Sequence, residues 1–349
     1  MEGIMGGRGR GRRVPRWAPN RNIPPAGPST ASPTPTFINT LDIKPEDVQE
    51  VKRILAKTRN LPLELVDIIL DCAQYWACST TTIDYTNLQP GNHMSVYGSS
   101  LRENEFLLRT QPLGLTKWTP SSDDLWKVVT PPKTLEEEYP ESKLLNFADA
   151  ATAQASEHPV RKVVFDITSC DQGHSSHRED FGTYRSSFTW FDAGLERFDA
   201  KNECLPECPD RTSSEPNNDE DSSQPNDAEK IPTCAIRPVW PPIVPRDGKQ
   251  EMRYYHELLP TADHLIQANK HASREMNHHH VEWSWDDQVD PDSVEAMKLK
   301  DIGRGPATAN GEFVRNLKIG DMITVWARSR FPGWTNKIQK VEVRVYWAI

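Results

Sequence analysis

The sequence predicts a mainly β protein, an antiparallel two-sheet sandwich of the jelly-roll kind, with a short N-terminal helical hairpin that makes it α+β overall. Two observations carry this prediction. Apolar and polar residues alternate in several runs after residue 160, and glycine or proline turns separate those runs. Half-polar alternating strands with short turns favour antiparallel sheets over a parallel α/β arrangement.

The composition indicates a folded part diluted by unfolded segments. The 349 residues are 36% hydrophobic and 26% charged, and 29 of them are prolines. Residues 1–39 read as a disordered tail, rich first in Arg and Gly and then in Pro, Ser and Thr. No run approaches the roughly 20 apolar residues that cross a bilayer, and the first 30 residues have no apolar signal core. We therefore expect a non-membrane, intracellular protein, cytoplasmic or nuclear, with reduced cysteines.

Charge is unevenly distributed along the chain. Residues 1–22 carry six arginines and one glutamate, a net charge of +5, whereas residues 201–230 carry a net charge of −6, against −9 overall. An Arg-Gly arm can attract nucleic acid through its charge, and an unstructured terminus is the alternative. If the arm acts in this way, deleting residues 1–22 should abolish a salt-sensitive interaction with RNA.

Two helices are expected near the N-terminus. The first begins at Pro45 with acidic residues in its opening turn, and the second begins at Leu61-Pro62. Its apolar residues recur at helical spacing: Leu65, Ile68, Ile69 and Cys72. Two short helices bury too little area to be stable alone, so the hairpin must pack on something else.

The segment 61–76 also looks like the opening of an F-box, in which a helix inserts apolar residues into a partner. This gives an alternative function, a ubiquitin-ligase adaptor with a Skp1-like partner and the β domain as substrate receptor. The second half of an F-box is not evident after Trp76, and Leu-Pro is also an ordinary helix start.

The segment 40–158 is expected to combine this hairpin with a connector that packs on the β domain. Met94–Tyr97 and Glu105–Arg109 are candidate strands, and a short helix is expected around 141–155. Periodicity is weak elsewhere in the connector.

The β domain is expected to span 159–349, interrupted by a disordered acidic insertion at 201–232 that such a fold tolerates entropically. Trp283 and Trp285 share a face with Val281 and are interpreted as core. The expected strands lie at 163–169, 182–191, 279–286, 322–331 and 341–347.

Several motifs of the β domain together resemble a largely uncharacterised family of fungal proteins. They are Asp171-Gln172-Gly173, Gly182-Thr183-Tyr184, Thr189–Gly194, Trp283–Asp287, Gly311–Arg315, Val325–Trp334 and Val345–Ala348. The resemblance covers roughly 40–200 and 235–349, and it implies one continuous domain family without supplying a mechanism. The family pattern usually has Trp after Asp-Gln-Gly, whereas this chain has His174.

The first candidate site is the turn that contains Asp171, Gln172 and His174, beside Trp190. An acid and an amide at the mouth of a sandwich can hydrogen-bond a sugar or peptide, with the indole as a stacking surface. The alternative is that Asp and Gly simply satisfy a tight turn.

The second candidate site is the face formed by Trp326, Arg328 and Arg330, together with Trp334. Guanidinium groups near an indole can clamp a carboxylate or phosphate or stack on the ring. The competing interpretation is a structural ion network. In that network, arginines pair with aspartates to hold loops: Arg304, Arg328 and Arg330 with Asp286, Asp287 or Asp321.

No metal, cofactor or catalytic residue is predicted. His278 and His280 would project together beside Glu282, and Cys204 and Cys208 have a spacing that can bind zinc, but neither pair has the further ligands of a standard site. Recognisable nucleophile, zinc-hydrolase and phosphate-loop motifs are missing from the sequence. The leading hypothesis is therefore a non-catalytic module that binds a peptide, glycan or small ligand through the Asp171 loop and the Trp326–Trp334 region.

Overall fold

Two five-stranded antiparallel sheets form the centre of the molecule, as the computed structural model describes it for residues 43–87, 91–120, 123–148, 158–202, 231–246 and 251–349. These described residues all belong to one unit, Ser32–Ile349. The tail 1–39 and most of the expected acidic insertion, including Cys204 and Cys208, lie outside the described residues.

The first sheet has the order β1-β12-β4-β10, and β2 pairs with β12 beyond the end of β1. Its strands are β1 (Ala77–Asp84), β2 (Met94–Tyr97), β4 (Val160–Cys170), β10 (Asn277–Ser284) and β12 (Thr335–Trp347). The long β12 is its central strand and pairs with β1, β2 and β4.

The second sheet has the order β3-β11-β5-β6, and β9 also pairs with β5. Its strands are β3 (Asn104–Arg109), β5 (Thr189–Phe198), β6 (Ile236–Trp240), β9 (Leu265–Ala268) and β11 (Met322–Ser329). A separate two-stranded ribbon consists of β7 (Ile243–Pro245) and β8 (Met252–Tyr254).

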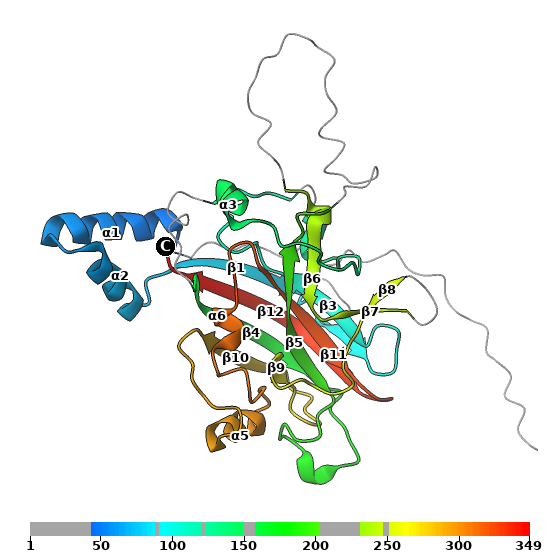
Figure 1. The fold of residues 1–349 in the computed structure, drawn as a ribbon. Helices are drawn as coiled ribbons and strands as arrows, with labels where there is room; N and C mark the ends of the chain where they lie inside the picture. Colours follow the sequence, from blue (N-terminus) through cyan, green and yellow to red (C-terminus); the bar gives the residue numbers. More distant parts are fainter. Residues whose placement is uncertain (1–42, 88–90, 121–122, 149–157, 203–230, 247–250) are drawn as a thin grey trace, which may run out of the picture. The chain divides into compact units, whose positions relative to one another are not determined.

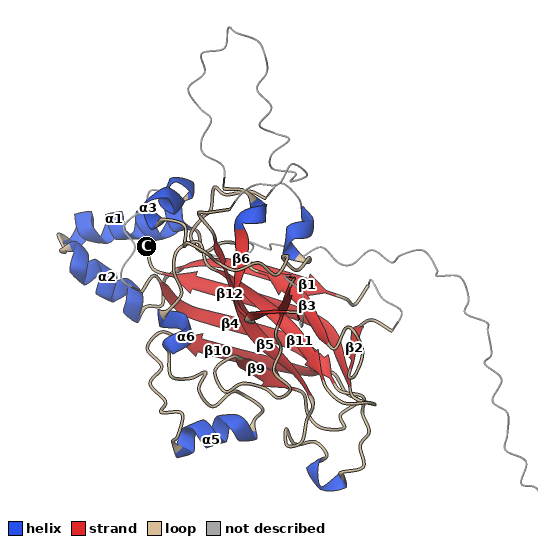
Figure 2. Ribbon diagram, turned by 45° about the vertical axis from the view of Figure 1, so that its right-hand side comes forward, coloured by secondary structure: helices blue, strands red, loops and turns tan. Residues whose placement is uncertain are grey.

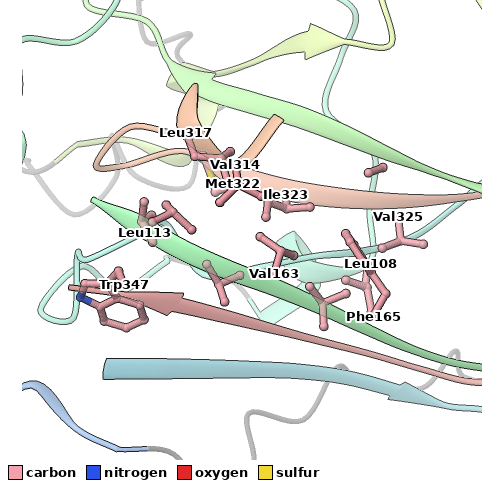
Figure 3. Close-up of a cluster of buried hydrophobic side chains, with 14 of the residues drawn as sticks. Leu108, Leu113, Val163, Phe165, Val314, Leu317, Met322, Ile323, Val325 and Trp347 are labelled. Atoms are coloured by element: carbon pink, nitrogen blue, oxygen red, sulfur yellow. The ribbon is translucent and has the colours of Figure 1, made fainter. Parts of the chain in front are cut away.

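The inner faces of the two sheets meet in one hydrophobic core. Figure 3 shows Val163 and Phe165 of β4 in the same cluster as Leu108 of β3 and Val325 of β11. The expected alternation is confirmed here, because the inward-facing residues of β4 and β11 are buried apolar side chains. Trp283 is also core, with its ring 4.9 Å from that of Phe165. Trp285 is partly buried and packs against the same cluster.

Helices lie outside the sheets (Figure 2). They are α1 (Pro45–Arg59), α2 (Leu63–Cys72), α3 (Glu141–Leu144), α5 (Val294–Asp301), α6 (Glu312–Arg315) and the 3-10 turns η1 (Asp123–Trp126), η2 (Leu145–Phe147), η4 (Arg178–Asp180) and η5 (Thr233–Ala235). The expected hairpin α1–α2 lies beside the C-terminal residue (Figure 1). Asp71 of α2 anchors it by accepting hydrogen bonds from Trp76 Nε1 at 2.8 Å and Arg161 Nε at 3.0 Å.

Three expectations about secondary structure need correction. The strand expected at 182–191 starts only at Thr189, because 182–188 is a series of turns in which Gly182 and Ser186 have positive φ angles of 74° and 52°. The helix expected around 141–155 is limited to α3 and η2 among its described residues. Strand β1 was not expected, since its run of threonines has no apolar alternation to indicate a strand.

Candidate functional site

Four loops meet at one end of the sandwich, which we call the loop end. They are 98–103 between β2 and β3, 171–188 between β4 and β5, 269–276 between β9 and β10, and 330–334 between β11 and β12. Backbone hydrogen bonds join them: Gly98 N to Trp334 O at 3.0 Å, Arg330 N to Phe188 O at 2.9 Å, and Gly182 N to His271 O at 2.9 Å. The loops therefore form one surface.

Asp171 and Gln172 hold this surface together from inside. The buried Asp171 carboxylate accepts hydrogen bonds from Gly173 N at 2.7 Å and Ala272 N at 2.6 Å. Burial raises the pKa of Asp171, although these two bonds oppose the rise. Gln172 donates to His174 O at 2.8 Å and accepts from Thr335 N at 3.2 Å. The polar atoms of both side chains are thus used in hydrogen bonds that hold the loops. Of the three predicted residues Asp171, Gln172 and His174, only His174 is well exposed.

Five rings form a continuous chain across the loop end. Their centroids are separated by 5.9 Å from Phe181 to His271, 5.2 Å from His271 to Trp334, 5.2 Å from Trp334 to Phe188, and 4.7 Å from Phe188 to Phe331. The two end rings are accessible, with Phe181 46% and Phe331 39% exposed. We call this set the ring chain.

His271 lies in the middle of the ring chain and is fully buried. Its Nδ1 lies 3.1 Å from Arg185 O and 3.0 Å from Ser186 O, and because carbonyl oxygens only accept, Nδ1 carries the proton. Its Nε2 has no hydrogen-bond partner among the described residues. The ring fixes the 182–188 turns against the 269–276 loop.

Phe331 has an unusual backbone conformation. Its φ angle is 64°, in the left-handed region that bulky residues rarely adopt. Such strain costs about 1–3 kcal/mol and persists only where the surroundings impose it, often at binding sites. Here the constraint comes from Arg330 N, which bonds Phe188 O, and from Trp334 N, which bonds Phe331 O at 3.3 Å. The turn thereby presents the Phe331 ring at the surface.

Arg330 is the hub beneath that turn. Its buried guanidinium donates to Glu103 O at 3.2 Å, Ser329 O at 3.1 Å and Glu257 O at 2.7 Å, and it lies 5.2 Å from the centre of the Trp190 ring. The side chain fixes three segments to one another. Its donors are directed at backbone carbonyls of the protein.

Arg328 and Trp326 lie deeper, on the outer face of the second sheet, and both are buried. Arg328 donates from Nε to Asp192 Oδ2 at 2.9 Å and from Nη1 to Asn104 Oδ1 at 3.2 Å and His256 Nδ1 at 2.6 Å. Burial and the adjacent guanidinium lower the pKa of His256 to about 2, so its ring is neutral. The partners that the sequence suggested for the arginines need correction. Arg328 pairs with Asp192, Arg330 bonds backbone carbonyls, and Arg304 donates to His280 O.

A covering segment, residues 252–264, which begins with β8, explains why this outer face is buried. Tyr254 donates to Thr130 O at 2.9 Å, its ring centre lies 5.4 Å from that of Trp326, and the ring of His264 stacks on Trp240 at 3.9 Å. Trp190, Trp326 and Arg328 therefore belong to an internal layer. Any direct role for them in ligand binding stays a prediction.

The structure places five of the residues suggested by the sequence at the loop end: Asp171, Gln172, His174, Arg330 and Trp334. Of the ring chain, only Trp334 was among them. Phe181 lies in a turn, where no periodicity marks it, and His271 lies in a loop far along the chain. Phe331 was expected as the last residue of the strand 322–331, but β11 ends at Ser329 and Phe331 lies in the turn after it. The one signal available was the phenylalanine in Arg330-Phe331-Pro332-Gly333, because a large apolar residue in a turn has no core to fill.

Two other clusters of polar side chains lie outside the loop end. A cavity of about 640 Å³ lies among α3, the end of β5 and the segment 315–321. Several of its charged groups pair with one another, as in the contact of Arg197 Nε with Asp321 Oδ1 at 2.7 Å. On the outer face of the first sheet, His278 and His280 both contact Asp166, at 3.2 and 2.8 Å. Among the residues that the structure describes, no group of three or more His, Cys, Asp or Glu side chains is arranged to hold a metal ion.

Comparisons with protein-family models, with curated proteins and with solved structures found no match. The resemblance to the fungal family, and the meaning of His174 within it, therefore stay predictions. None of the helices in the described part of the chain is both long and apolar enough to span a membrane.

Proposed function

We propose that the protein is a non-catalytic binding module whose ligand, a peptide, glycan or small molecule, contacts the loop end of the sandwich. The observation that carries this proposal is the ring chain with its two accessible ends, Phe181 and Phe331. Aromatic side chains provide large, rigid contact areas for a ligand. The left-handed backbone at Phe331 supports it further, since the strain keeps an apolar ring in solvent contact.

The state of the polar groups at the loop end favours binding over catalysis. A catalytic acid, base or nucleophile must reach the reacting atom. Asp171 and Arg330, the two strongly polar side chains beneath the ring chain, are buried and bonded to backbone groups. The exposed apolar part of this surface includes the rings of Phe181 and Phe331.

A glycan array and a peptide array, probed with the full chain and with the variant Phe181→Ala/Phe331→Ala, test the proposal. We expect specific signals that the double variant loses. Ile54→Ala is a matched control, because Ile54 is an exposed apolar residue (46%) on α1, which lies beside the C-terminal residue (Figure 1). Binding that survives in the double variant would remove the loop end from consideration.

A second candidate function, the ubiquitin-ligase adaptor, is favoured by the surface of α2. Its Val66 and Leu70 are buried against the rest of the protein. A second apolar stripe is exposed at positions i, i+3, i+4 and i+7: Leu65, Ile68, Ile69 and Cys72. Four apolar side chains exposed on one face of a helix are unusual in the absence of a partner, and this spacing is the one by which helices dock into partner grooves.

Size-exclusion chromatography with a purified Skp1-like protein tests the adaptor. We expect a complex that Ile68→Glu abolishes and that Met297→Glu on α5 leaves intact. Failure of the unmodified chain to form this complex would retire the adaptor and leave the binding module unaffected.

A further inference from the structure

A group of basic side chains gathers around β10, the edge strand of the first sheet, next to the loop end. His279 of β10 is buried, with 7% of its surface exposed, and its ring centroid lies 6.0 Å from that of Tyr184. Lys270 follows β9, and Arg304 follows α5 and donates from Nη2 to His280 O at 2.5 Å. We call Tyr184, Lys270, His279 and Arg304 the basic cluster.

Contacts between the segments of the basic cluster show that they are neighbours in space. His271 N donates to Thr183 O at 2.7 Å, which joins the loop of Lys270 to the turn of Tyr184. A Cβ added to Gly303 would lie 2.5 Å from Tyr184 Cδ1, so the tyrosine ring packs directly on the segment that follows α5. Tyr184 therefore connects the two segments that carry the cations of the cluster.

The two cations, Lys270 and Arg304, form no ion pair with any residue that the structure describes. By contrast, the buried Arg328 pairs with Asp192 at 2.9 Å. A guanidinium has five N–H donors, and within the described ranges only Nη2 of Arg304 has a hydrogen-bond partner. Burial lowers the pKa of Arg304, which shows that its charge is partly removed from water. A half-buried cation without a counter-charge is unfavourable, so this group has unused capacity to bind an anion.

The imidazole of His279 has unused hydrogen-bonding capacity as well. Its Nε2 is buried and has no hydrogen-bond partner in the part of the chain that is described. Burial lowers the pKa of His279 to about 4, and the positive charges of Lys270 and Arg304 act in the same direction. The ring is therefore neutral at pH 7 and carries one N–H that can donate. A buried polar atom without a protein partner commonly marks the place of a water or an ion.

Acidic side chains close to the basic cluster are engaged elsewhere. Glu282 acts on Arg304 only at longer range, and its carboxylate lies 2.9 Å from His280 Nε2. Asp301, the last residue of α5, lies 3.7 Å from Arg185. The positive charge of the cluster is therefore open to an anion that is not part of this chain.

We propose that the basic cluster binds a phosphate group, with Lys270 and Arg304 as the charged contacts and His279 and Tyr184 as further hydrogen-bond donors. Two positive charges match a phosphate group, which carries a charge of about −1.5 to −2 at pH 7. A guanidinium forms short, bidentate hydrogen bonds with phosphate oxygens, and Lys is also a common phosphate ligand. The same chemistry accepts inorganic phosphate or a phosphate monoester. The site goes beyond the proposed binding module, because it does not use the ring chain.

Isothermal titration calorimetry of the full chain, in phosphate-free buffer, tests the proposal with inorganic phosphate, methyl phosphate and acetate. We expect saturable phosphate binding whose affinity falls about tenfold or more in Lys270→Met and in Arg304→Met, because each removes a charged hydrogen bond. Lys57→Met and Arg59→Met are matched controls, since both remove an exposed cation from the last turn of α1, and they should bind like the unmodified chain. The Lys270 side chain has no hydrogen bond among the described residues, so Lys270→Met is informative even if Arg304→Met is unstable.

The probes separate the sources of the phosphate. Tighter binding of methyl phosphate than of inorganic phosphate would identify a monoester as the ligand, and the reverse order would identify the free ion. Acetate binding as tight as phosphate binding would overturn the assignment to phosphate. Absence of phosphate binding, or equal binding by the test and control variants, would overturn the site itself. Phe181→Ala/Phe331→Ala should bind phosphate like the wild type, so failure of this site and failure of the binding module are separate results.

Discussion

Acidification should destabilise this fold through His256, and the structure allows the size of the effect to be worked out. Arg328 Nη1 donates to His256 Nδ1 at 2.6 Å, a contact that requires the neutral ring. Burial and this guanidinium lower the pKa of His256 from 6.5 to about 2. Below pH 6.5, His256 therefore binds a proton in the unfolded chain but stays neutral in the folded chain. Stability is intact above that pH and is lost progressively as pH falls through the window from 6.5 towards 2.

One proton bound only in the unfolded state changes the free energy of unfolding by about 1.4 kcal/mol per pH unit. Between pH 7 and pH 5 the loss attributable to His256 is about 2 kcal/mol. Burial lowers the pKa of His279 to about 4, and the same reasoning adds about 2 kcal/mol for that residue. Domains of this kind are stable by roughly 5–15 kcal/mol, so the combined effect is large.

Urea unfolding at pH 7, 6 and 5 measures the effect, and His256→Asn isolates it. The Asn oxygen can accept the Arg328 hydrogen bond but does not titrate. The variant should therefore lose about 2 kcal/mol less than the wild type over this range, whatever its stability at pH 7. His279→Phe, which removes the other depressed imidazole, should reduce the loss by a similar amount. Equal pH dependence in His256→Asn and the wild type would refute the reasoning.

Three further predictions concern the same layers. Arg328→Met should cost about 3–5 kcal/mol in urea unfolding, because it leaves the Asp192 carboxylate buried without its partner, and adding Asp192→Asn should recover part of that loss. Gly194→Ala should destabilise the fold by about 1–3 kcal/mol through overpacking, because the added Cβ would lie 2.3 Å from Thr324 Oγ1 and 2.8 Å from Trp240 O. A melting temperature equal to that of the wild type would contradict this prediction. Phe331→Gly should stay within about 1 kcal/mol of wild-type stability, because relief of about 1–2 kcal/mol of left-handed strain offsets the ring contact with Phe188. The same variant should lose ligand binding, and a stability loss of about 3 kcal/mol would mean that the ring is part of the core.

The fold class could be predicted because the inner faces of the sheets follow a simple alternation. Inward-facing apolar residues alternate along these strands and are buried, and that pattern identifies the strands and their core face: Val163, Phe165 and Ile167 in β4, Val281 and Trp283 in β10, and Ile323, Val325 and Ala327 in β11. The pattern fails where strands carry threonines, as in β1, or are only three to five residues long, as in β6 to β9. It also overextended β5 to residue 182. Tyr184, Ser186 and Phe188 alternate with polar residues as strand residues do, yet the chain turns at both Gly182 and Ser186.

The outer face of the second sheet could not be predicted for a different reason. Alternation correctly placed Trp326 and Arg328 on the face opposite the core of β11, and an opposite face normally meets solvent. Here residues 252–264 cover this face. No feature of that segment's sequence predicts that it packs against the second sheet. Covering the face turned the arginine pairs into buried ion pairs. The candidate site predicted from strand periodicity, Trp326 with Arg328 and Arg330, is therefore buried.

The loop end illustrates the complementary limit. Strand residues are constrained by a period, whereas a turn brings together side chains that no period relates, so the ring chain depends on how four separate loops meet. Asp171 and Arg330, which hold these loops together, were predicted from the sequence as ligand-binding residues, because acids and guanidinium groups in turns are often functional. In the structure both side chains are buried and bonded to backbone groups, so they hold the loops together. The rings of Phe181 and Phe331, which the sequence did not single out, are the accessible ends of the ring chain on the surface that these loops form.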